Sequence, residues 1–327
     1  VEVSALIRLR EALGGTIGQA IRPFLEDMPH YLEELDAAAA VGREAYNELS
    51  GGIFDWRDIG ATLLGSVPVL AAVALVNMAF LRAGDELLIP DNAYGPNKSL
   101  VEGELMGWGI THQYYDPMDP QDLEAQISSR TRLVWLEAAG SVTLEFPDLL
   151  SLLRICKQRK VLTALDNTWG AGLAFNPFEL SGADGSTQAV DLTIHALTKY
   201  PSGGGDVLMG SVITRDPGLH MRLKLTHMRL GLGVGANDVE AVLRSLPSMP
   251  LRYRAHDEAT RALAQWAQTQ AEFVQVLHPS LEEFPGHVHW KAQCVNEAGG
   301  AAGLFSVMLD ARFSQAQVDA FCDAMQV

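Results

Sequence analysis

Two residues with chemistry of their own close two apolar segments in the middle of the chain. The segment VLTALD ends at Asp166, and the segment DLTIHAL is followed directly by Thr198 and Lys199. In a parallel sheet, ligands collect outside the carboxyl ends of the strands, so polar residues at those ends are candidates for chemistry. If the two segments are neighbouring strands, the Asp166 carboxylate and the Lys199 amine lie at the same rim of the sheet.

An amine beside a carboxylate is the pair that pyridoxal phosphate chemistry requires. The amine can form a Schiff base and carry protons, and the carboxylate can keep the ring nitrogen cationic, so that the ring accepts electrons. An ordinary salt bridge between Asp166 and Lys199 explains the same two positions equally well. Strand positions alone leave both interpretations open.

Three further features could complete such a site. The helix expected after Pro68 offers the backbone amides of Val69 and Leu70, and the positive end of its dipole, to a phosphate. The Thr198 hydroxyl could add a donor. Tyr94 follows the apolar segment LLIP and could stack on a flat cofactor, or it could be a plain loop tyrosine.

The remaining polar candidates have weaker claims. The run from Gly203 to Gly205 could cradle a phosphate or form a flexible turn before a buried strand. We interpret His195 as structural, because its spacing of four from Lys199 falls on a strand and a loop and does not bring the side chains together. No metal-ligand spacing is visible among the later histidines His227, His256, His278, His287 and His289.

The segments that must position these residues alternate between two patterns. Apolar bursts predict strands at 87–90, 111–115, 132–137, 161–166, 191–197 and 207–213, and helical spacing predicts helices at 97–107, 120–128 and 146–159. This alternation predicts an α/β protein with a mostly parallel sheet covered by helices on both faces.

After residue 216 the pattern becomes rich in helices. Helices are expected at 237–245, at 252–270 and from Ser314 onward, with a strand inside 303–310. We therefore expect three regions, which are an N-terminal helical segment at 1–60, a cofactor-binding domain at 61–245 and a smaller C-terminal α+β domain at 246–327.

The composition argues against several classes of protein. Forty acidic and 24 basic residues give a formal net charge of −16, which disfavours nucleic acid and anionic membranes as partners. Residues 61–81 carry no charge, but Pro68 leaves an apolar helix of only about 20 Å, which favours a core helix over a membrane span. The start lacks an export signal, and Cys156, Cys294 and Cys322 have no metal or disulfide spacing, so we expect a cytoplasmic protein.

Longer motifs resemble the Cys/Met-metabolism family of pyridoxal-phosphate enzymes. They are NAYGP at 92, LEAAGSVTLE at 136, DNTWGAG at 166, ALTKYPSGGGDVLMGSV at 196, and LHPSLEEFPGH followed by GLFSVML. The resemblance covers residues 69–327. It implies the aspartate-aminotransferase-like fold (PLP fold type I), pyridoxal 5'-phosphate as cofactor, and a homo-oligomer, a dimer of dimers in which paired subunits complete each other's sites.

Carried over by position, the resemblance implies a role for each candidate. Lys199 would form the Schiff base and shuttle protons, Asp166 would pair with the ring nitrogen, and Tyr94 would stack on the ring. The phosphate would be held by Thr198 and by the amides of Val69 and Leu70.

Two motifs favour the β-lyase branch of the family. Trp169 in DNTW and the turn Gly140-Ser141-Val142-Thr143 resemble β-lyases, whereas the γ-synthase and γ-lyase branch tends toward DNTF and an N-P-T turn. The implied reaction is β-elimination of an amino-acid thioether such as cystathionine, which gives homocysteine, pyruvate and ammonia. A γ-acting relative, and a truncated or divergent member that binds the cofactor without turnover, are the alternatives.

The chain departs from the family's pattern in three places. Val69 stands where the phosphate cup usually has glycine. Arg57 in FDWRDIG is only a loose counterpart of the Tyr-x-Arg motif that a neighbouring subunit normally lends to the phosphate. The arginine that clamps the substrate carboxylate is expected beyond Val327, so the C-terminal domain is expected to be truncated.

Overall fold

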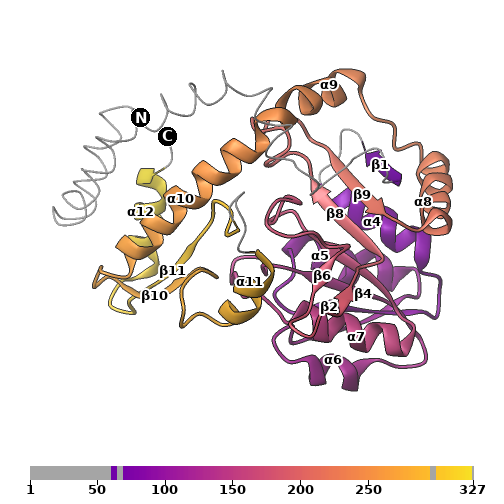
Figure 1. Cartoon of the computed structure of the whole chain (residues 1–327), viewed down its shortest axis with the longest axis horizontal. Coiled ribbons are helices and arrows are strands. Elements are labelled where there is room, and N and C mark those ends of the chain that lie inside the picture. Colours follow the sequence, from indigo (N-terminus) through magenta and orange to yellow (C-terminus); the bar gives the residue numbers. More distant parts are fainter. Residues whose placement is uncertain (1–59, 65–68, 295–299, 326–327) are drawn as a thin grey trace.

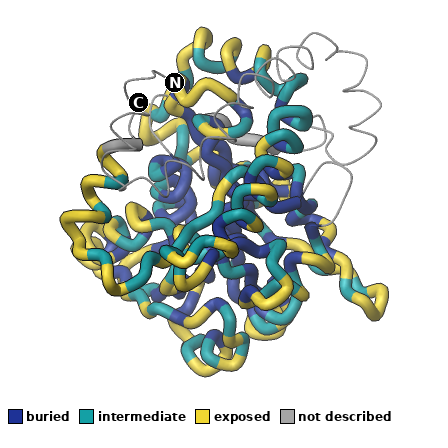
Figure 2. The backbone as a smooth tube through the Cα atoms, turned by 90° about the vertical axis from the view of Figure 1, so that its left-hand side faces the viewer, coloured by how far each residue is buried: buried dark blue, intermediate teal, exposed yellow. Residues whose placement is uncertain are grey.

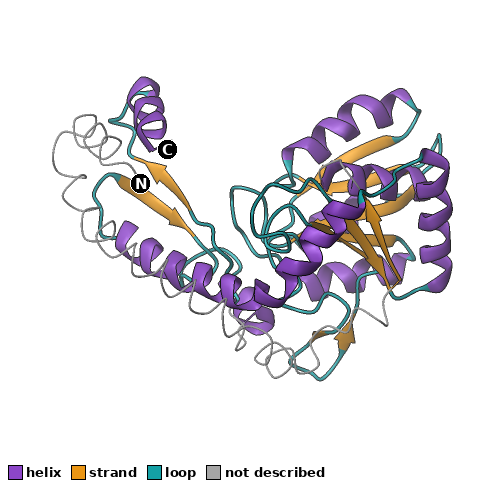
Figure 3. Cartoon of the chain, turned by 90° about the horizontal axis from the view of Figure 1, so that it is seen from above, coloured by secondary structure: helices purple, strands orange, loops and turns teal. Residues whose placement is uncertain are grey.

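The computed structural model describes residues 60–64, 69–294 and 300–325. Figure 1 shows a larger lobe around a central sheet and a smaller lobe beside it. In Figure 3 the smaller lobe extends away from the sheet as a strand pair and helices. It comprises α10 (Met249–Ala267), β10 (Phe273–Leu277), β11 (Ser306–Leu309) and α12 (Gln315–Met325). Apart from Gly60, the N-terminal helical segment expected at 1–60 lies outside the described residues.

Within the described residues, seven strands form the central sheet in the order β1-β9-β8-β5-β4-β2-β3. The strands from β8 to β3 are parallel to one another, whereas β9 and β1 are antiparallel additions at one side. The expected α/β fold with a mostly parallel sheet is therefore confirmed. The bounds are β1 (Gly60–Leu64), β2 (Glu86–Pro90), β3 (Thr111–Tyr115), β4 (Thr131–Glu137), β5 (Leu162–Asp166), β8 (Leu192–Ala196) and β9 (Gly210–Thr214).

Helices cover both faces of this sheet. Strand β4 shows why, because Leu133 and Trp135 pack against one helical layer, whereas Val134 and Leu136 pack against the other. Successive side chains of a strand point to opposite faces, so strands buried on both sides are continuously apolar. Figure 2 shows the buried residues gathered in the middle of the molecule. The first layer holds α4 (Val69–Phe80), α5 (Gly95–Leu100) and α8 (Pro217–Leu230), and the second holds α6 (Pro120–Gln126) and α7 (Leu149–Arg159).

Helix α4 is the uncharged helix predicted from sequence to be too short to span a membrane. It lies in the core. Leu75 and Val76 are fully buried, and Asn77 Oδ1 accepts a hydrogen bond of 3.0 Å from Trp135 Nε1 on the sheet. Every helix among the described residues is too short or too polar to cross a membrane. The interpretation of this segment as a core helix agrees with its packing.

Two expected elements differ in detail. The helix expected at 97–107 consists of α5 followed by a π-helical turn, Val101–Leu105. The strand expected at 207–213 begins only at Gly210, because Val207 and Met209 pack in a separate small cluster with Val242 of α9 (Ala236–Ser245).

The sequence pattern does not predict helix α8 or strand β10. Helix α8 buries only Leu223, so its apolar periodicity is weak. Its ends are nevertheless marked: Asp216 Oδ1 accepts from the backbone of Leu219 at 2.8 Å, and Gly231 closes the helix with a φ of 64°. The two-residue strands β6 (Leu180–Ser181) and β7 (Thr187–Gln188) carry no pattern that could predict them.

The segment after α9 does not pack as one unit. Tyr253, Phe284 and Trp290 belong to the same buried cluster as Phe146 and Trp169 of the larger lobe, and Trp290 lies on α11 (His287–Cys294). Only the far part has a core of its own, built on Ala264, Ala267 and Val276. The division into domains at 61–245 and 246–327 stays a prediction.

Candidate active site

Two buried carboxylates stand side by side at the carboxyl ends of β4 and β5. Glu137 is the last residue of β4, Asp166 is the last residue of β5, and the two are direct register partners. Both residues are only 8% exposed. Paired residues of neighbouring strands point to the same face, so both side chains point toward the layer that contains α4 and α5.

The turn after β5 is bonded to β8. Asp166 Oδ1 accepts from the backbone of Thr168 at 2.9 Å, and Thr168 Oγ1 accepts from the backbone of Ala196, also at 2.9 Å. Burial raises the pKa of Asp166, while the hydrogen bonds from Thr168 and the charge of Lys199 oppose the rise. Asp166 is therefore held rigidly in a place that lacks a full countercharge.

Lys199 lies in the turn that follows β8, with its backbone N–H bonded to the Ala196 carbonyl at 3.2 Å. Its side chain is exposed, and its charge lowers the pKa of both Asp166 and Glu137. The salt bridges among the described residues do not include one between Lys199 and Asp166. The ordinary ion pair that the sequence left open is not formed, although the two charges face the same edge.

Tyr94 follows β2 and reaches this edge as well. Its backbone N–H donates to Glu137 Oε2 at 2.8 Å, and its ring is half-buried. Burial, and then the charges of Asp166 and Glu137, raise the pKa of the Tyr94 phenol, which is therefore protonated at neutral pH. The structure thus brings Tyr94, Asp166 and Lys199 together.

The first turn of α4 lies at the side of this edge. A Cβ placed on Gly210 would come within 3.6 Å of Val69 Cα, and Gly210 is the register partner of Ala196 at the end of β8. Val69 is buried and Leu70 is half-buried. Amides in the first turn of a helix have no partner within the helix, so this end of α4 could bind an anion beside Lys199.

The Thr198 hydroxyl contacts the backbone of Met209. The Oγ1 atom accepts from the Met209 backbone N–H at 3.2 Å and lies 3.4 Å from the Met209 carbonyl oxygen. The hydroxyl therefore ties the lysine turn to the segment before β9.

Residues of the smaller lobe contact Tyr200, the residue after Lys199. The ring of Tyr200 packs against the ring of Tyr253 at 4.9 Å, and its hydroxyl accepts from the Gly303 backbone at 2.8 Å. The Tyr200 carbonyl accepts from Arg252 Nη1, also at 2.8 Å. A Cβ on Gly203 would lie 2.7 Å from the Arg252 guanidinium carbon, so the glycine gives this guanidinium room.

Among the other candidates, His195 lies on the opposite face of the sheet from Asp166, because Ile194 is the register partner of Asp166. His195 is buried, and burial lowers its pKa to about 4, which suits a neutral structural histidine. The described residues contain no group of three or more His, Cys, Asp or Glu side chains able to hold a metal ion. Arg57 lies outside the described residues.

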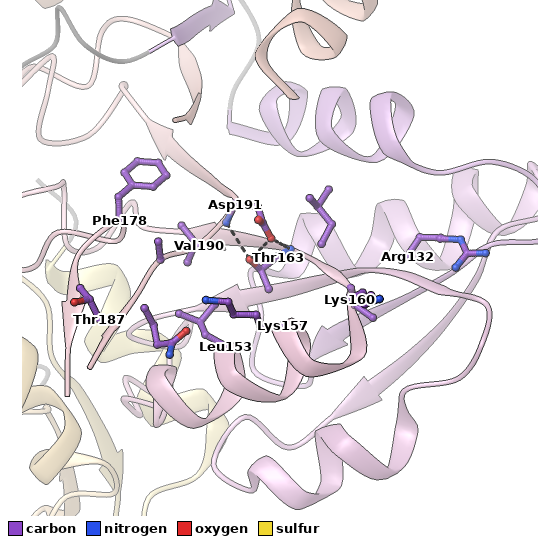
Figure 4. A pocket seen from close by; sticks show the side chains of 13 residues that line it. Arg132, Leu153, Lys157, Lys160, Thr163, Phe178, Thr187, Val190 and Asp191 are labelled. Carbon is purple, nitrogen blue, oxygen red and sulfur yellow. Dashed lines mark hydrogen bonds between the residues drawn. The ribbon is translucent and has the colours of Figure 1, made fainter. Parts of the chain in front are cut away.

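A cavity of about 620 Å³ lies at the opposite edge of the sheet, at the amino ends of β5 and β8 (Figure 4). There Asp191 Oδ2 accepts from both the backbone N–H and the hydroxyl of Thr163 at 2.8 Å. Because that carboxylate already has two donors, and because the amine and the carboxylate pair are at the other edge, we place the candidate active site at the carboxyl ends of the strands.

A sequence model of the family described as Cys/Met metabolism PLP-dependent enzyme matches residues 63–327. The chain belongs to this family. A putative cystathionine β-lyase of Rhizobium johnstonii is 34% identical over 79% of this chain and 63% of its own length. The cystathionine β-lyase of Bordetella avium is 33% identical over 73% of this chain and 57% of its own. The chain therefore spans about six tenths of the length of these two relatives.

Solved structures of the Cys/Met-metabolism family type have the same fold. The crystal structure of metB from Corynebacterium glutamicum has a TM-score of 0.70 and 23% identity, and covers 76% of this chain and 61% of that one. The cystathionine γ-lyase from Lactobacillus plantarum, complexed with L-serine, also has a TM-score of 0.70, with 21% identity, and covers 78% of this chain and 63% of that one. Together with the parallel sheet, they confirm the expected fold type I.

The residues at the candidate site fit pyridoxal phosphate, the cofactor of this family. Asp166 is a buried carboxylate whose raised pKa indicates that it lacks a full countercharge, which a protonated ring nitrogen would supply. An exposed amine, a half-buried phenol ring and a helix N-terminus stand around it.

Sequence reasoning missed Glu137, although a signal was present. Glu137 ends the apolar segment TRLVWLE as Asp166 ends LTALD. The same rule that selects Asp166 also selects Glu137 once β4 and β5 are known to be neighbours. Arg252 had no such signal, because its contact with Tyr200 joins positions 52 residues apart.

Proposed function

We propose that the protein catalyses the pyridoxal-phosphate-dependent β-elimination of cystathionine, or of a related cysteine S-conjugate, to homocysteine, pyruvate and ammonia. The observation that carries this proposal is that Lys199, Asp166 and Tyr94 meet at one edge of the sheet, in a member of a PLP-dependent family. The β-lyase branch is supported by the names of the relatives and by Trp169 and the Gly140–Thr143 turn.

We assign the cofactor contacts as the sequence predicts. Lys199 would hold the cofactor through Nζ, Asp166 would hold its ring nitrogen, and the Tyr94 ring would lie against it. When bound, the cofactor supplies an electron sink for the negative charge that develops at the substrate Cα. The phosphate would be held by the amides of Val69 and Leu70 and by the Thr198 hydroxyl, whose contact of 3.4 Å with the Met209 carbonyl is long enough to yield to a stronger acceptor.

Lys199 is the proton carrier of the proposed reaction. Once the substrate amine has taken its place in the covalent contact, the freed Nζ would take the proton from the substrate Cα, and the Cβ–S bond would break with its electron pair on sulfur. The sulfur takes a proton and leaves as homocysteine. One water molecule converts the remaining three-carbon unit to pyruvate and ammonia, so the overall reaction turns cystathionine and water into homocysteine, pyruvate and ammonia.

We also propose a cytoplasmic homo-oligomer, a dimer of dimers, that works on a small amino-acid thioether without nucleic acid or membrane. The three cysteines Cys156, Cys294 and Cys322 are free, which suits a reducing compartment. Light scattering on the purified protein tests the assembly, and a stable monomer with full activity would overturn it.

The test of the reaction is product analysis with cystathionine. Purified protein loaded with the cofactor should be yellow, lose the visible absorbance on borohydride treatment, and release pyruvate and homocysteine in equal amounts. Lys199→Ala should be colourless and inactive, because it removes the only proposed covalent contact. A yellow Lys199→Ala protein, or a colourless parent protein, would contradict the assignment.

A γ-acting enzyme is the second candidate, because relatives of this chain include a probable cystathionine γ-synthase of Herpetosiphon aurantiacus, 27% identical over 71% of this chain and 69% of its own length. Release of 2-oxobutyrate and cysteine instead of pyruvate and homocysteine would establish γ-cleavage. Protein that binds the cofactor but releases neither oxo acid would support binding without turnover.

A further inference from the structure

A set of hydrogen bonds joins three segments beside the candidate site. The Tyr94 backbone N–H donates to Glu137 Oε2 at 2.8 Å, and the Ser141 hydroxyl donates to Glu137 Oε1 at 2.6 Å. The Ser141 backbone N–H donates in turn to the Asn92 carbonyl at 3.0 Å. The loop of Tyr94, the end of β4 and the turn after β4 are therefore closed into one ring of contacts.

The Asn92 side chain adds two hydrogen bonds between the Tyr94 loop and the turn after β4. Its Nδ2 donates to Thr143 Oγ1 at 3.2 Å and to Glu145 Oε2 at 3.1 Å. A Cβ on Gly140 would lie 2.3 Å from the same Nδ2, so only glycine leaves room for the Asn92 side chain in this position. The turn at 140–145 is thus docked against the loop that carries Tyr94.

We propose that Glu137 is a positioning residue, which fixes Tyr94 relative to Asp166 by bridging the Tyr94 backbone to Ser141. The Gly140–Thr143 turn then acts on the site through Glu137 and Asn92. The inference rests on the proposed function for its effect on the cofactor, but the bridge itself can be tested on the protein without cofactor.

The bridge can form with Glu137 ionised or protonated. An ionised carboxylate accepts from both donors, whereas a protonated one can donate from Oε1 to the Ser141 hydroxyl and still accept from Tyr94 at Oε2. The charged groups that face Glu137 are Asp166 from β5 and Lys199 from the turn after β8. Burial, followed by the Asp166 charge, raises the pKa of Glu137, and the Lys199 charge lowers it, so the bridging carboxylate also responds to charge at the site.

This geometry separates two substitutions. Glu137→Gln can donate to the Ser141 hydroxyl through its amide nitrogen and accept from Tyr94 through its oxygen, so it should keep the bridge without the charge. Glu137→Ala removes both bonds. An ordinary hydrogen bond contributes about 0.5 to 1.5 kcal/mol, so the loss of two bonds corresponds to about 5-fold to 100-fold in an equilibrium.

Amide hydrogen exchange at Tyr94 reads the bridge directly, with and without bound pyridoxal phosphate. We expect Glu137→Ala to exchange the Tyr94 amide about 10-fold or more faster, Glu137→Gln to remain close to the parent protein, and Ser141→Ala to lie between them. Glu86→Gln is the matched control, because Glu86 is a buried carboxylate at the amino edge of the same sheet, bonded to Thr131 and Ser128. It should leave Tyr94 unchanged.

Cofactor binding gives the second measurement. Glu137→Ala should weaken pyridoxal phosphate binding about 10-fold, whereas Glu137→Gln should keep the affinity and shift the pH at which the visible absorbance changes. Unchanged exchange in Glu137→Ala, or in Ser141→Ala if the first variant does not fold, would overturn the bridge and leave the proposed function standing. Protein that binds no pyridoxal phosphate but shows the exchange pattern would keep the bridge and refute the proposed function.

Discussion

At the scale of single residues, burial and the proposed role place opposite requirements on the charge of Asp166. It is buried at a strand end, where burial raises the pKa of its carboxyl group and disfavours its charge. The proposed role nevertheless requires that charge opposite a cationic ring nitrogen. A residue held in this way should cost stability when the cofactor is absent and stabilise the complex when it is present.

Asp166→Asn should therefore change stability and binding in opposite directions. The amide can still accept from the Thr168 backbone, so the turn is kept while the buried charge is removed. We expect the cofactor-free protein to become more stable by about 1 kcal/mol and pyridoxal phosphate to bind at least about 10-fold more weakly. Urea unfolding and equilibrium dialysis measure the two quantities.

Asp191→Asn is the control for this substitution, because Asp191 sits at the opposite edge of the sheet with Thr163 as its partner. It should leave cofactor affinity unchanged. Equal losses of affinity in the two variants would show that Asp166 acts through general stability and not through the ring nitrogen.

At the scale of elements, the turn after β4 is held in a strained conformation. Val142 has a φ of 67°, and the Thr143 backbone N–H donates to the Ser141 carbonyl at 2.7 Å across it, which makes a three-residue turn of the rare positive-φ kind. A β-branched residue is a poor choice for that region. Val142 is also 77% exposed, so its side chain gains little from packing.

Val142→Gly should raise the free energy of unfolding by about 0.5 to 1 kcal/mol, because relief of the positive-φ strain exceeds the added entropy of the unfolded chain. Val142→Ala is the matched control, since it removes the exposed methyl groups but retains a Cβ. Thermal unfolding of the three proteins distinguishes them. If alanine stabilises as much as glycine, the exposed side chain and not the backbone is the source of the effect.

Elements with strong patterns were predictable from sequence, and long-range contacts were not. The sheet strands β2, β3, β4, β5 and β8 and the helix α4 follow from hydrophobic runs, and the strand-end rule points to Asp166 and Lys199. Helix α8 was not predicted because it buries only Leu223. Strand β10 was not predicted because only Val276 along it is buried. Glu137 needed the order of strands, which no local pattern contains.

At the scale of the whole molecule, the two lobes meet at the lysine turn. Arg252 donates to the Tyr200 carbonyl and to the Ser245 carbonyl and hydroxyl, and Tyr200 in turn accepts from Gly303. The residue next to Lys199 is thus bonded to α10 and to the segment just before β11. The smaller lobe therefore helps to fix the backbone beside the amine.

Two buried histidines, one in each lobe, should make the fold sensitive to acid. Burial lowers the pKa of His195 on β8 to about 4, and burial followed by the Arg261 charge lowers that of His278 to about 4. Both values lie below the ordinary value near 6.5 of an unfolded chain, so the unfolded state binds protons first as the pH falls. Their stabilising contribution is present above pH 6.5 and is lost as the pH drops toward 4.

His278→Gln should therefore flatten the acid side of the stability curve, by up to about 3 kcal/mol between pH 6.5 and 4, since each unit of pKa shift is worth about 1.4 kcal/mol. Urea unfolding at a series of pH values gives the curve. Ser280→Ala is the control, because it removes the hydroxyl that lies 2.7 Å from His278 Nδ1 and leaves the buried ring in place. Ser280→Ala should keep the dependence of the unfolding free energy on pH below 6.5. If His278→Gln keeps it too, carboxyl groups elsewhere, and not His278, govern the loss of structure in acid.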